Sequence, residues 1–579
     1  TATLLCVTPP DEHQEQGIRA FLQKKYGEDV ALTIQQDASL KSGFQLHVGS
    51  EVYDWSAKGR MEQFRQQVEQ LVAKNTRKDI IPLLRSSIDE FRLLAKSSEV
   101  GTVKSIGDGI AVVEGLEHAA YGEILMFDNG IKGMVQDLRR NETGCILFDN
   151  ADDISAGSKV ARTGKTAGVP VGDAFLGRVV DALGRPIDGG DAIPADGYRP
   201  VEEPAPGIID RQSVDTPMET GLLSIDAMFP IGRGQRELII GDRQTGKTAI
   251  ALDAMLNQKG KNVICVYVAI GQKASSVAQL VENLRKRDAM DYCVVVSATA
   301  GEADTMQYIA PYAGCAMAEY YMHKGRDVLI VYDDLSKHAI AYRAMSLLLE
   351  RAPGREAYPG DVFYLHSRLL ERSAHLSDKL GGGSMTALPI VETQAGDVSA
   401  YIPTNIISIT DGQIFLESDL FFAGQRPAVN VGLSVSRVGG AAQTKATKKA
   451  TGSLRLDLAQ YREMEVFTQF SSDLDDSTKE QLHYGQGLMR ILRQKQYHPL
   501  SMHQQVIVLV CAMGHVLSKV AVKDVTDFRD ALLDHFEQEH SDLCRSLEDE
   551  KVLTDDMKQE ILRIAEAFRT ANAERFRKE

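Results

Sequence analysis

Long hydrophobic runs are absent from this chain of 579 residues. No apolar run approaches the roughly 20 residues that cross a bilayer. The longest, residues 506–513, fits one side of a buried helix instead. The first residues lack the basic segment followed by an apolar run that marks a signal peptide. We therefore expect a soluble protein, although it can still sit on a membrane complex.

Positive charge is also in short supply. The formal net charge is −15, whereas domains that bind nucleic acid in general are basic. Acidity by itself mainly favours solubility and leaves room for a local basic channel. We therefore expect no nucleic-acid partner.

Paired cysteines are missing too. The seven cysteines contain no Cys-x-x-Cys pair and are scattered through apolar or helical stretches. Neither a disulfide framework nor a zinc site is expected from this pattern. The prediction is reduced, mostly buried cysteine in a cytosol-like compartment, at Cys6, Cys145, Cys265, Cys293, Cys315, Cys511 and Cys544.

What remains is the composition of an ordinary globular protein, with 43% apolar and 25% charged residues. A chain of this length exceeds a single hydrophobic core, so three or four domains are expected. Changes of pattern along the chain predict a multidomain α/β protein. Its expected parts are a small α+β extension (1–73), a connecting helix (74–98), a β-barrel (99–165), a domain of alternating strands and helices (166–448) and a helical bundle (449–579).

Periodicity supports these divisions. In the extension, residues 15–26 and 61–73 have helical spacing, while 30–33 and 44–48 look extended. Residues 99–162 alternate short β-branched runs with Gly, Asp and Asn turns, which is typical of a small barrel. In the middle domain the strand candidates are near-continuously apolar, as expected for parallel strands covered on both faces. These candidates are residues 238–240, 263–268, 293–296 and 328–332.

The strongest chemical signal is Gly241-Asp-Arg-Gln-Thr-Gly-Lys-Thr248, which matches G-x-x-x-x-G-K-[ST] at every fixed position. Glycines let the backbone N–H groups point at phosphate oxygens, and a helix that starts near the end of the motif adds its positive N-terminus. A strand before the motif and a helix after it are the setting that this function requires. The motif predicts a site for ATP or ADP, built from Gly241, Asp242, Arg243, Gln244, Thr245, Gly246, Lys247 and Thr248.

A magnesium ion is expected in the same site. The Thr248 hydroxyl can coordinate Mg²⁺, and the apolar run 328–332 ends in Asp333 and Asp334. A carboxylate at the end of such a strand, here Asp333, is placed to hold the ion or its waters. A simple acid in a strand-end turn is the other interpretation of this pattern.

A hydrolytic site also needs a group that activates water, and here the sequence departs from the usual choice. After the strand at 263–269, Gln272 stands where hexameric ATPases of this kind commonly carry a glutamate. An amide orients water but is a very weak base. The sequence therefore predicts a site that binds ATP and turns it over slowly or not at all.

Arg437 is a further candidate, because an arginine fork suits the spread charge of a transferring phosphoryl group. It could act on this chain's own nucleotide, act on a neighbour's, or form a structural salt bridge. Spacing alone does not choose among these.

The order of the motifs resembles one family. Residues from about 76 to 579 are similar, nearly end to end, to the alpha subunits of F-type ATP synthases. The resemblance is carried by the phosphate loop together with Glu99-Val-Gly-Thr-Val, Ile106-Gly-Asp-Gly-Ile-Ala, Gly184-Arg-Pro-Ile-Asp188 and two longer runs over residues 352–368 and 390–405.

The resemblance implies a RecA-like P-loop domain between the barrel and the helical bundle. It implies a ring in which three such chains alternate with three beta subunits around a gamma shaft, serving proton- or sodium-coupled ATP synthesis or hydrolysis. In that family the alpha site is non-catalytic, and Gln272 occupies the place of the beta glutamate. Arg437, with Ser434 in the same motif, matches the arginine lent to the beta site. Segments that line the adenine pocket match Arg426, Pro427, Gln494 and Gln496.

The first 73 residues depart from alpha subunits. They resemble the C-terminal portion of the delta subunit of the same enzyme, through Asp37-Ala-Ser-Leu-Lys-Ser-Gly-Phe, Val48-Gly-Ser-Glu-Val-Tyr-Asp54 and Gly59-Arg-Met-Glu-Gln-Phe-Arg65. Delta and the b peripheral stalk are therefore expected partners, although three copies of a delta fragment exceed the one that the complex needs. The implied location is the cytoplasmic face of the bacterial inner membrane, reached indirectly through the ion-translocating sector.

One alternative stays open at this point. A self-sufficient hexameric ATPase of the RecA or transcription-termination helicase type shares the phosphate loop, but it needs a glutamate near Gln272 and a nucleic-acid channel.

Overall fold

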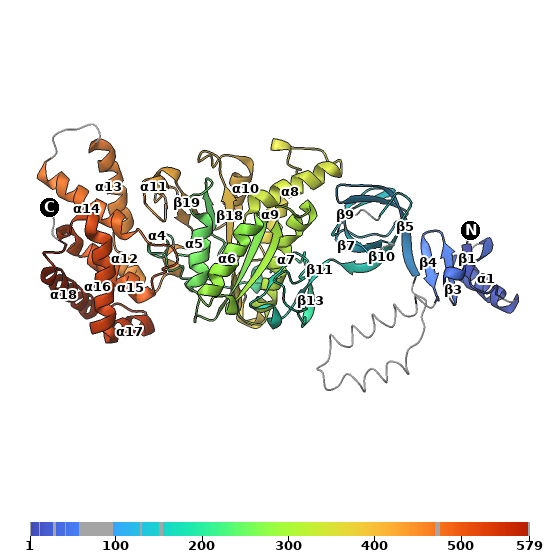
Figure 1. Ribbon diagram of the computed structural model, residues 1–579, viewed down its shortest axis with the longest axis horizontal. Helices are drawn as coiled ribbons and strands as arrows, with labels where there is room; N and C mark the ends of the chain where they lie inside the picture. The colour runs from blue at the N-terminus through green and yellow to red at the C-terminus, as the bar shows by residue number, and fades with distance from the viewer. Residues whose placement is uncertain are drawn as a thin grey trace.

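Four parts follow one another along the length of the molecule, from the N-terminal sheet to a C-terminal group of helices (Figure 1). This arrangement comes from a computed structural model, which describes residues 2–10, 12–26, 30–40, 42–56, 59, 97–127, 130–149, 154–468 and 475–576. The expected helix at 61–73 lies outside these residues, as does the expected connecting helix 74–98 up to residue 96. Ser97 and Ser98, its last two residues, belong to a strand.

The N-terminal part is a small α+β unit, as predicted. Strand β1 pairs in parallel with β2 and antiparallel with β3, and β3 pairs antiparallel with β4. Leu4 and Leu46 from the sheet pack against Leu22 of the helix. The elements are β1 (Ala2–Cys6), α1 (Glu12–Tyr26), β2 (Leu32–Gln36), β3 (Phe44–Val48) and β4 (Glu51–Asp54).

A six-stranded barrel follows. Its strands run in the order β10-β7-β8-β9-β6-β5, and pairing of β10 with β5 closes it around a core that includes Val113, Leu125 and Val135. Strand β5 also pairs with β4, so the N-terminal sheet continues directly into the barrel. The strands are β5 (Ser97–Gly107), β6 (Ile110–Glu114), β7 (Glu123–Phe127), β8 (Lys132–Leu138), β9 (Glu142–Leu147) and β10 (Lys159–Thr166).

The nucleotide domain is built on an eight-stranded sheet in the order β12-β16-β15-β17-β18-β14-β19-β20, parallel except for β20. A two-stranded pair, β11 (Gly168–Val171) with β13 (Gly197–Pro200), lies beside it. The strands of the main sheet are β12 (Val179–Val180), β14 (Leu238–Gly241), β15 (Val263–Gln272), β16 (Cys293–Thr299), β17 (Asp327–Asp333), β18 (Ser384–Glu392), β19 (Gly412–Leu416) and β20 (Val435–Ser436).

Helices cover both faces of this sheet, which explains the near-continuous apolar strands. Along β15, Cys265 and Tyr267 enter one hydrophobic core while Val266 and Val268 enter the other. Successive side chains of a strand point to opposite faces, so both faces need apolar residues. The helices are α4 (Leu223–Met228), α5 (Lys247–Leu256), α6 (Ala274–Lys286), α7 (Asp304–His323), α8 (Leu335–Leu348), α9 (Val362–Leu370), α10 (Tyr401–Ile409) and α11 (Ser418–Phe422).

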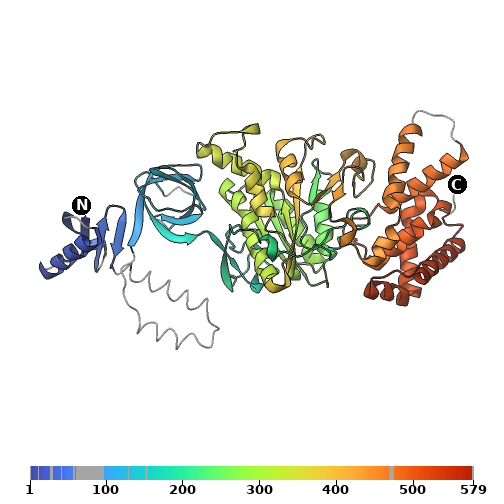
Figure 2. The ribbon, with the colours of Figure 1, turned by 180° about the vertical axis from the view of Figure 1, so that it is seen from behind.

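The C-terminal part is helical, as predicted, and Figure 2 shows it from behind at the end away from the barrel. Helix α15 is buried almost throughout, and Val506 and Leu509 share one core with Leu222 and Ile231 of the nucleotide domain. The helices are α12 (Lys445–Thr451), α13 (Leu454–Thr468), α14 (Asp476–Ile491), α15 (Met502–Met513), α16 (Val525–Glu539), α17 (Ser541–Glu550) and α18 (Asp555–Ala571).

Two composition-based expectations can be compared with this fold. All seven cysteines are buried, as predicted, and none forms a disulfide. Among the described residues, none of the helices combines the length and the apolar composition that a membrane span requires.

Candidate nucleotide-binding site

The phosphate loop lies between β14 and α5, the strand–loop–helix setting that its motif requires. Its two fixed glycines are needed for different reasons. Gly246 has φ of 93°, a left-handed conformation that strains residues with side chains. A Cβ on Gly241 would lie 2.6 Å from the carbonyl oxygen of Leu416, on the adjacent strand β19. The loop backbone is therefore fixed from both ends.

Asp242 braces the loop. Its carboxylate accepts hydrogen bonds from the Thr393 hydroxyl at 2.7 Å, the Gly396 amide at 2.8 Å and the Ser418 hydroxyl at 3.0 Å. Burial works to raise the pKa of Asp242, but these hydrogen bonds and nearby Lys247 outweigh it and lower the pKa. The carboxylate stays charged and holds the loop, so its role is structural support for the phosphate cradle.

Lys247 is the buried cation of the loop. Its ammonium donates to the carbonyl oxygens of Gly241, at 2.9 Å, and Asp242. Burial lowers the pKa of Lys247. Nearby carboxylates oppose this shift, and Glu392 has the largest effect among them. Arg243, in contrast, points outward: its side chain is 80% exposed and pairs with Glu392. Gln244 is exposed at a positive φ of 60°. Of the two loop cations, Lys247 is therefore the one placed for phosphates.

The residues expected to hold magnesium lie together. The Thr248 hydroxyl donates to Asp333 Oδ2 at 2.7 Å, and the Gln272 amide donates to Asp333 Oδ1 at 3.0 Å. Mg²⁺ takes oxygen ligands at 2.0–2.1 Å in an octahedron, so adjacent ligands lie about 3 Å apart. The Thr248 and Asp333 oxygens match that spacing and chemistry. They would hold the ion, which neutralises phosphate charge when bound.

Tyr267 is a member of this group that the sequence did not reveal. Its hydroxyl donates to Asp333 Oδ2, the same oxygen that Thr248 contacts. It belongs to β15, which runs parallel to β17 with Ala269 opposite Asp333. A tyrosine within an apolar strand looks like core, and only the pairing of β15 with β17 places its hydroxyl beside the carboxylate.

The segments matched to the adenine pocket also converge near the loop. The Arg426 guanidinium lies over the Phe421 ring at 4.2 Å, and Phe421 lies beside Gly246. The carbonyl of Arg426, which precedes Pro427, accepts a hydrogen bond from the Gln494 amide N–H at 2.9 Å. Chain segments 421–427 and 494–496 are thus joined at one side of the loop.

The two glutamines of this segment differ. The Gln494 side chain donates to the carbonyls of Gly221, at 2.7 Å, and His498, at 2.8 Å, and accepts from the Leu223 N–H at 3.1 Å. Gln496 is exposed and makes no side-chain hydrogen bond to the part of the chain that the structure describes. The Gln494 side chain therefore holds the segment in place, while the Gln496 side chain faces solvent.

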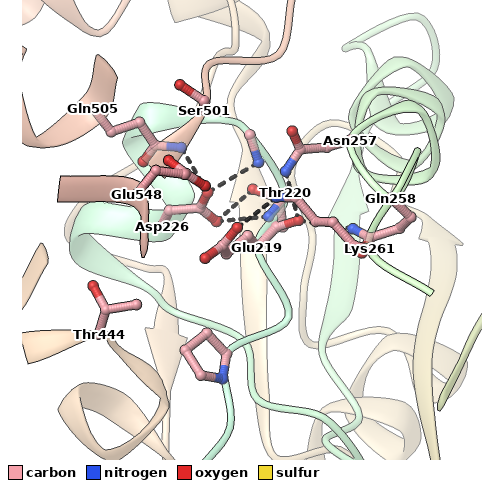
Figure 3. A network of polar contacts seen from close by, with 12 residues as sticks. Glu219, Thr220, Asp226, Asn257, Gln258, Lys261, Thr444, Ser501, Gln505 and Glu548 are labelled. Carbon is pink, nitrogen blue, oxygen red and sulfur yellow. Dashed lines mark hydrogen bonds and ion pairs between the residues drawn. The ribbon is translucent and has the colours of Figure 1, made fainter. Parts of the chain in front are cut away.

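Figure 3 shows the polar network around Asp226, which holds the neighbouring Thr220 and Gly221. Buried Asp226 accepts hydrogen bonds from the Thr220 N–H and hydroxyl, from the Gly221 N–H at 2.9 Å and from the Gln505 amide at 2.8 Å. Gln505 belongs to α15 of the helical domain. Because Gly221 is bound by Asp226 on its N–H and by Gln494 on its carbonyl, the helical domain helps to position the segment that contains Gln494.

Arg437 lies at the opposite edge of the sheet from the loop. Gly241 pairs with Leu416 at the far end of β19, whereas β20 pairs with its first residues, Gly412 opposite Ser436. Four residue steps of strand, about 13 Å, separate these levels, and the loop extends further in the other direction. Arg437 is therefore distant from this chain's own phosphate loop.

The Arg437 side chain is also free of contacts that would hold it in place within the described ranges. It is exposed and makes no hydrogen bond or ion pair with any residue in the described ranges. Burial raises the pKa of neighbouring Glu237 well above its usual range, so that carboxyl favours its neutral form. The carboxylate of Asp411 is held by Arg236 at 3.0 Å. Neither acid neutralises the Arg437 guanidinium.

Ser434 is not brought to the loop either. Its side chain is fully buried, and its hydroxyl accepts the Phe415 N–H at 2.9 Å. It braces β19 against the segment that leads to Arg437.

Comparison with known proteins agrees with this geometry. Family profiles match residues 221–436 as "ATP synthase alpha/beta family, nucleotide-binding domain", 443–568 as "ATP synthase alpha/beta chain, C terminal domain" and 96–164 as "ATP synthase alpha/beta family, beta-barrel domain". Residues 1–68 match "ATP synthase delta (OSCP) subunit".

Proteins that are similar over most of the chain are named as alpha subunits of ATP synthase. "ATP synthase subunit alpha" of Clostridium botulinum is 58% identical over 483 residues, covering 83% of this chain and 96% of the relative. That of Clostridium kluyveri is 56% identical over 491 residues, covering 85% of this chain and 97% of the relative. These matches favour the alpha subunit over the alternative, a self-sufficient helicase-type ATPase. The chain belongs to the ATP synthase alpha/beta family as an alpha subunit of the ATP synthase complex, with a delta-like segment at its N-terminal end.

Proposed function

We propose that this chain holds MgATP at its own loop without efficient hydrolysis, and lends Arg437 to the catalytic site of a neighbouring beta subunit. The observation that carries the proposal is the position of Arg437 at the opposite edge of the sheet from Gly241. An arginine there serves a nucleotide only if a second subunit brings one to it. In F-type enzymes, that nucleotide is on beta.

The holding role rests on Gln272. Its amide donates to Asp333 Oδ1 at 3.0 Å, beside the Thr248 hydroxyl that would share Mg²⁺. An amide at this position can orient water but accepts a proton very poorly. Lys247 and the loop backbone still supply the phosphate contacts, so binding is retained while the chemical step lacks its base.

The wider assembly follows from the family. The expected partners are beta subunits in an alternating ring, a gamma shaft, and delta and b at the peripheral stalk. The complex would couple proton or sodium flow to ATP synthesis or hydrolysis at the cytoplasmic face of the bacterial inner membrane. The match of residues 1–68 to delta supports a contact with the stalk through the N-terminal unit.

The test uses the purified chain and the reconstituted ring. Equilibrium binding should show one MgATP per chain, and steady-state assays of the chain alone should show little phosphate release. Robust ATP hydrolysis by the isolated chain would contradict the proposal. Adding beta and gamma subunits should restore turnover that depends on Arg437.

A further inference from the structure

A group of metal-binding side chains lies in the helical domain, far along the chain from the phosphate loop. His503 of α15, Glu537 of α16 and Cys544 of α17 each offer one ligand atom, and these atoms all lie within 4.8 Å of one another. Three separate helices thus bring a nitrogen, an oxygen and a sulfur ligand to one point. No role in nucleotide binding accounts for this meeting.

His503 is already oriented by two carboxylates. Its Nε2 lies 2.6 Å from Glu537 Oε1, and its Nδ1 lies 2.8 Å from Glu548 Oε2. Ser501 also contacts the ring, and the Gln504 amide donates to Glu537 Oε1 at 3.1 Å. Burial works against a charged imidazole, but the hydrogen bonds to Glu548 and Glu537 outweigh it and raise the pKa of His503. Without a metal, the contacts with the two carboxyl groups favour the protonated form of the ring.

Cys544 takes no part in that ion pairing, and it is buried in the hydrophobic core of the helical domain. Among the described residues, the hydrogen-bond partner of its thiol is the Phe536 carbonyl at 3.7 Å, which is a weak contact. Burial, with nearby Glu537, raises the pKa of the thiol to about 11. The group would stay protonated at neutral pH unless a metal displaced the proton.

We propose that His503, Glu537 and Cys544 form a Zn²⁺ site that joins helices α15, α16 and α17. Zn²⁺ binds imidazole nitrogen and carboxylate oxygen at 2.0–2.2 Å and thiolate sulfur at about 2.3 Å, usually in a tetrahedron. Ligand atoms in such a site lie about 3.4 Å apart, so the side chains present need to move by about 1 Å. Magnesium and calcium prefer all-oxygen sets and do not suit this group.

Glu548 would orient the His503 ring without binding the metal itself. A histidine that binds zinc through one ring nitrogen commonly donates its other N–H to a carboxylate, which fixes the ring. The Nδ1–H of His503 would keep its hydrogen bond to Glu548 while Nε2 turns to the metal. That hydrogen bond is the largest cause that lowers the pKa of Glu548, and Lys261, drawn with it in Figure 3, adds to the effect.

The binding step balances in charge and protons. Zn²⁺ displaces the thiol proton of Cys544 and, from a protonated ring, also the Nε2 proton of His503, so about one to two protons leave for each ion bound. Solvent can reach the site, because the side chains of Glu537 and Glu548 are 41% and 36% exposed. Water would fill the fourth position.

Cobalt titration of the full-length chain tests the proposal, with Mg²⁺ in excess to occupy the phosphate loop. Co²⁺ bound through Cys544 should give a thiolate charge-transfer band that saturates near one equivalent and disappears when Zn²⁺ is added. Cys544→Ala should abolish the band. Cys511→Ala is the matched control, since Cys511 is also buried in the helical domain but lies outside the cluster.

Two carboxylate variants guard against a folding artefact. Glu537→Gln removes an exposed ligand and should weaken Zn²⁺ binding at least tenfold in a competition assay with a chromogenic chelator. Glu548→Gln should weaken it by about 10- to 100-fold through loss of ring orientation. A band that is absent in the wild-type chain, or that survives Cys544→Ala, would overturn the zinc site and leave only the ion-paired histidine.

Discussion

The polar groups at the two edges of the eight-stranded sheet differ in whether they are paired within the chain. At the loop edge, Lys247, Asp242 and Asp333 are bound by other groups of the same chain. At the other edge, Arg437 is exposed and its two acidic neighbours do not neutralise it. The polar groups at the loop edge are paired within the chain, whereas the cation at the Arg437 edge has no partner among the described residues. This difference supports a chain that holds one nucleotide and acts on another.

The largest effect is expected from Arg437→Ala. In an assembled ring, it should reduce steady-state ATP hydrolysis by about 10³-fold or more, the range measured for arginines lent in trans. MgATP binding to this chain should change little, because Arg437 lies far from Gly241. Both quantities are measured on the same preparation.

Arg437→Lys serves as the control, since it keeps the charge but loses the planar fork, and it should recover only part of the activity. If Arg437→Ala weakened nucleotide binding to this chain and spared ring turnover, the comparison between the edges would fail.

The next effect concerns the loop edge. Lys247→Gln should weaken MgATP binding to the isolated chain by about 10- to 100-fold, because hydrogen bonds to charged groups contribute about 1.5–3 kcal/mol. Arg243→Gln is the matched change in the same loop and should have a much smaller effect, since Arg243 is exposed and paired with Glu392. Titration calorimetry measures both. Equal losses would mean that the buried and the exposed cation share the phosphates.

A third change tests why this site would bind ATP without hydrolysing it efficiently. Gln272→Glu places a carboxylate where the amide now donates to Asp333. A positioned base can contribute about 10²–10⁴-fold, but this site lacks a lent arginine, so we expect about a tenfold rise in single-turnover phosphate release by the isolated chain. Nucleotide affinity should fall severalfold, because two carboxylates then repel.

Gln272→Ala separates the two effects, since it removes the amide without adding a base. It should lower affinity with no rise in phosphate release. If Gln272→Glu gave no rise either, the missing base would not be what limits this site.

Local motifs allowed much of this arrangement to be predicted. The glycines and Lys247 of the loop, and the strand that ends in Asp333, are readable because their spacing is short and each has a fixed chemical reason. Gln272 could be recognised for the same reason, since it follows its strand directly. The four-part architecture followed from changes in apolar periodicity.

Other features depend on contacts between distant segments. Tyr267 reaches Asp333 only because β15 and β17 pair in register. The separation of Arg437 from its own loop became visible only when β20 was seen to pair with the start of β19. Ser434, which sits in the Arg437 motif, turned out to brace the backbone of Phe415. Zinc was not expected from the cysteine spacing, because the residues that meet around His503 come from three helices.

The smallest effect that we expect comes from one of these distant contacts. Asp253 of α5 accepts the Tyr497 N–H at 2.8 Å and so joins the helix after the loop to the 494–498 segment. Burial raises its pKa to about 6, against the opposing effects of that hydrogen bond and of Arg287. Because the folded-state pKa exceeds the unfolded one, the native state binds the extra proton, and stability falls as pH rises from about 4 to about 6.

Asp253→Asn should remove this penalty at neutral pH. The amide oxygen can still accept the Tyr497 N–H, while the buried charge is gone, so we expect a rise of about 2–4 °C in the unfolding temperature at pH 7. At pH 4 the wild-type carboxyl is largely protonated, and the two proteins should melt within about 1 °C of each other. Calorimetry across this pH range measures the difference. A gain that did not depend on pH would mean that Asp253 acts through packing, and that the loop edge carries no uncompensated charge at this position.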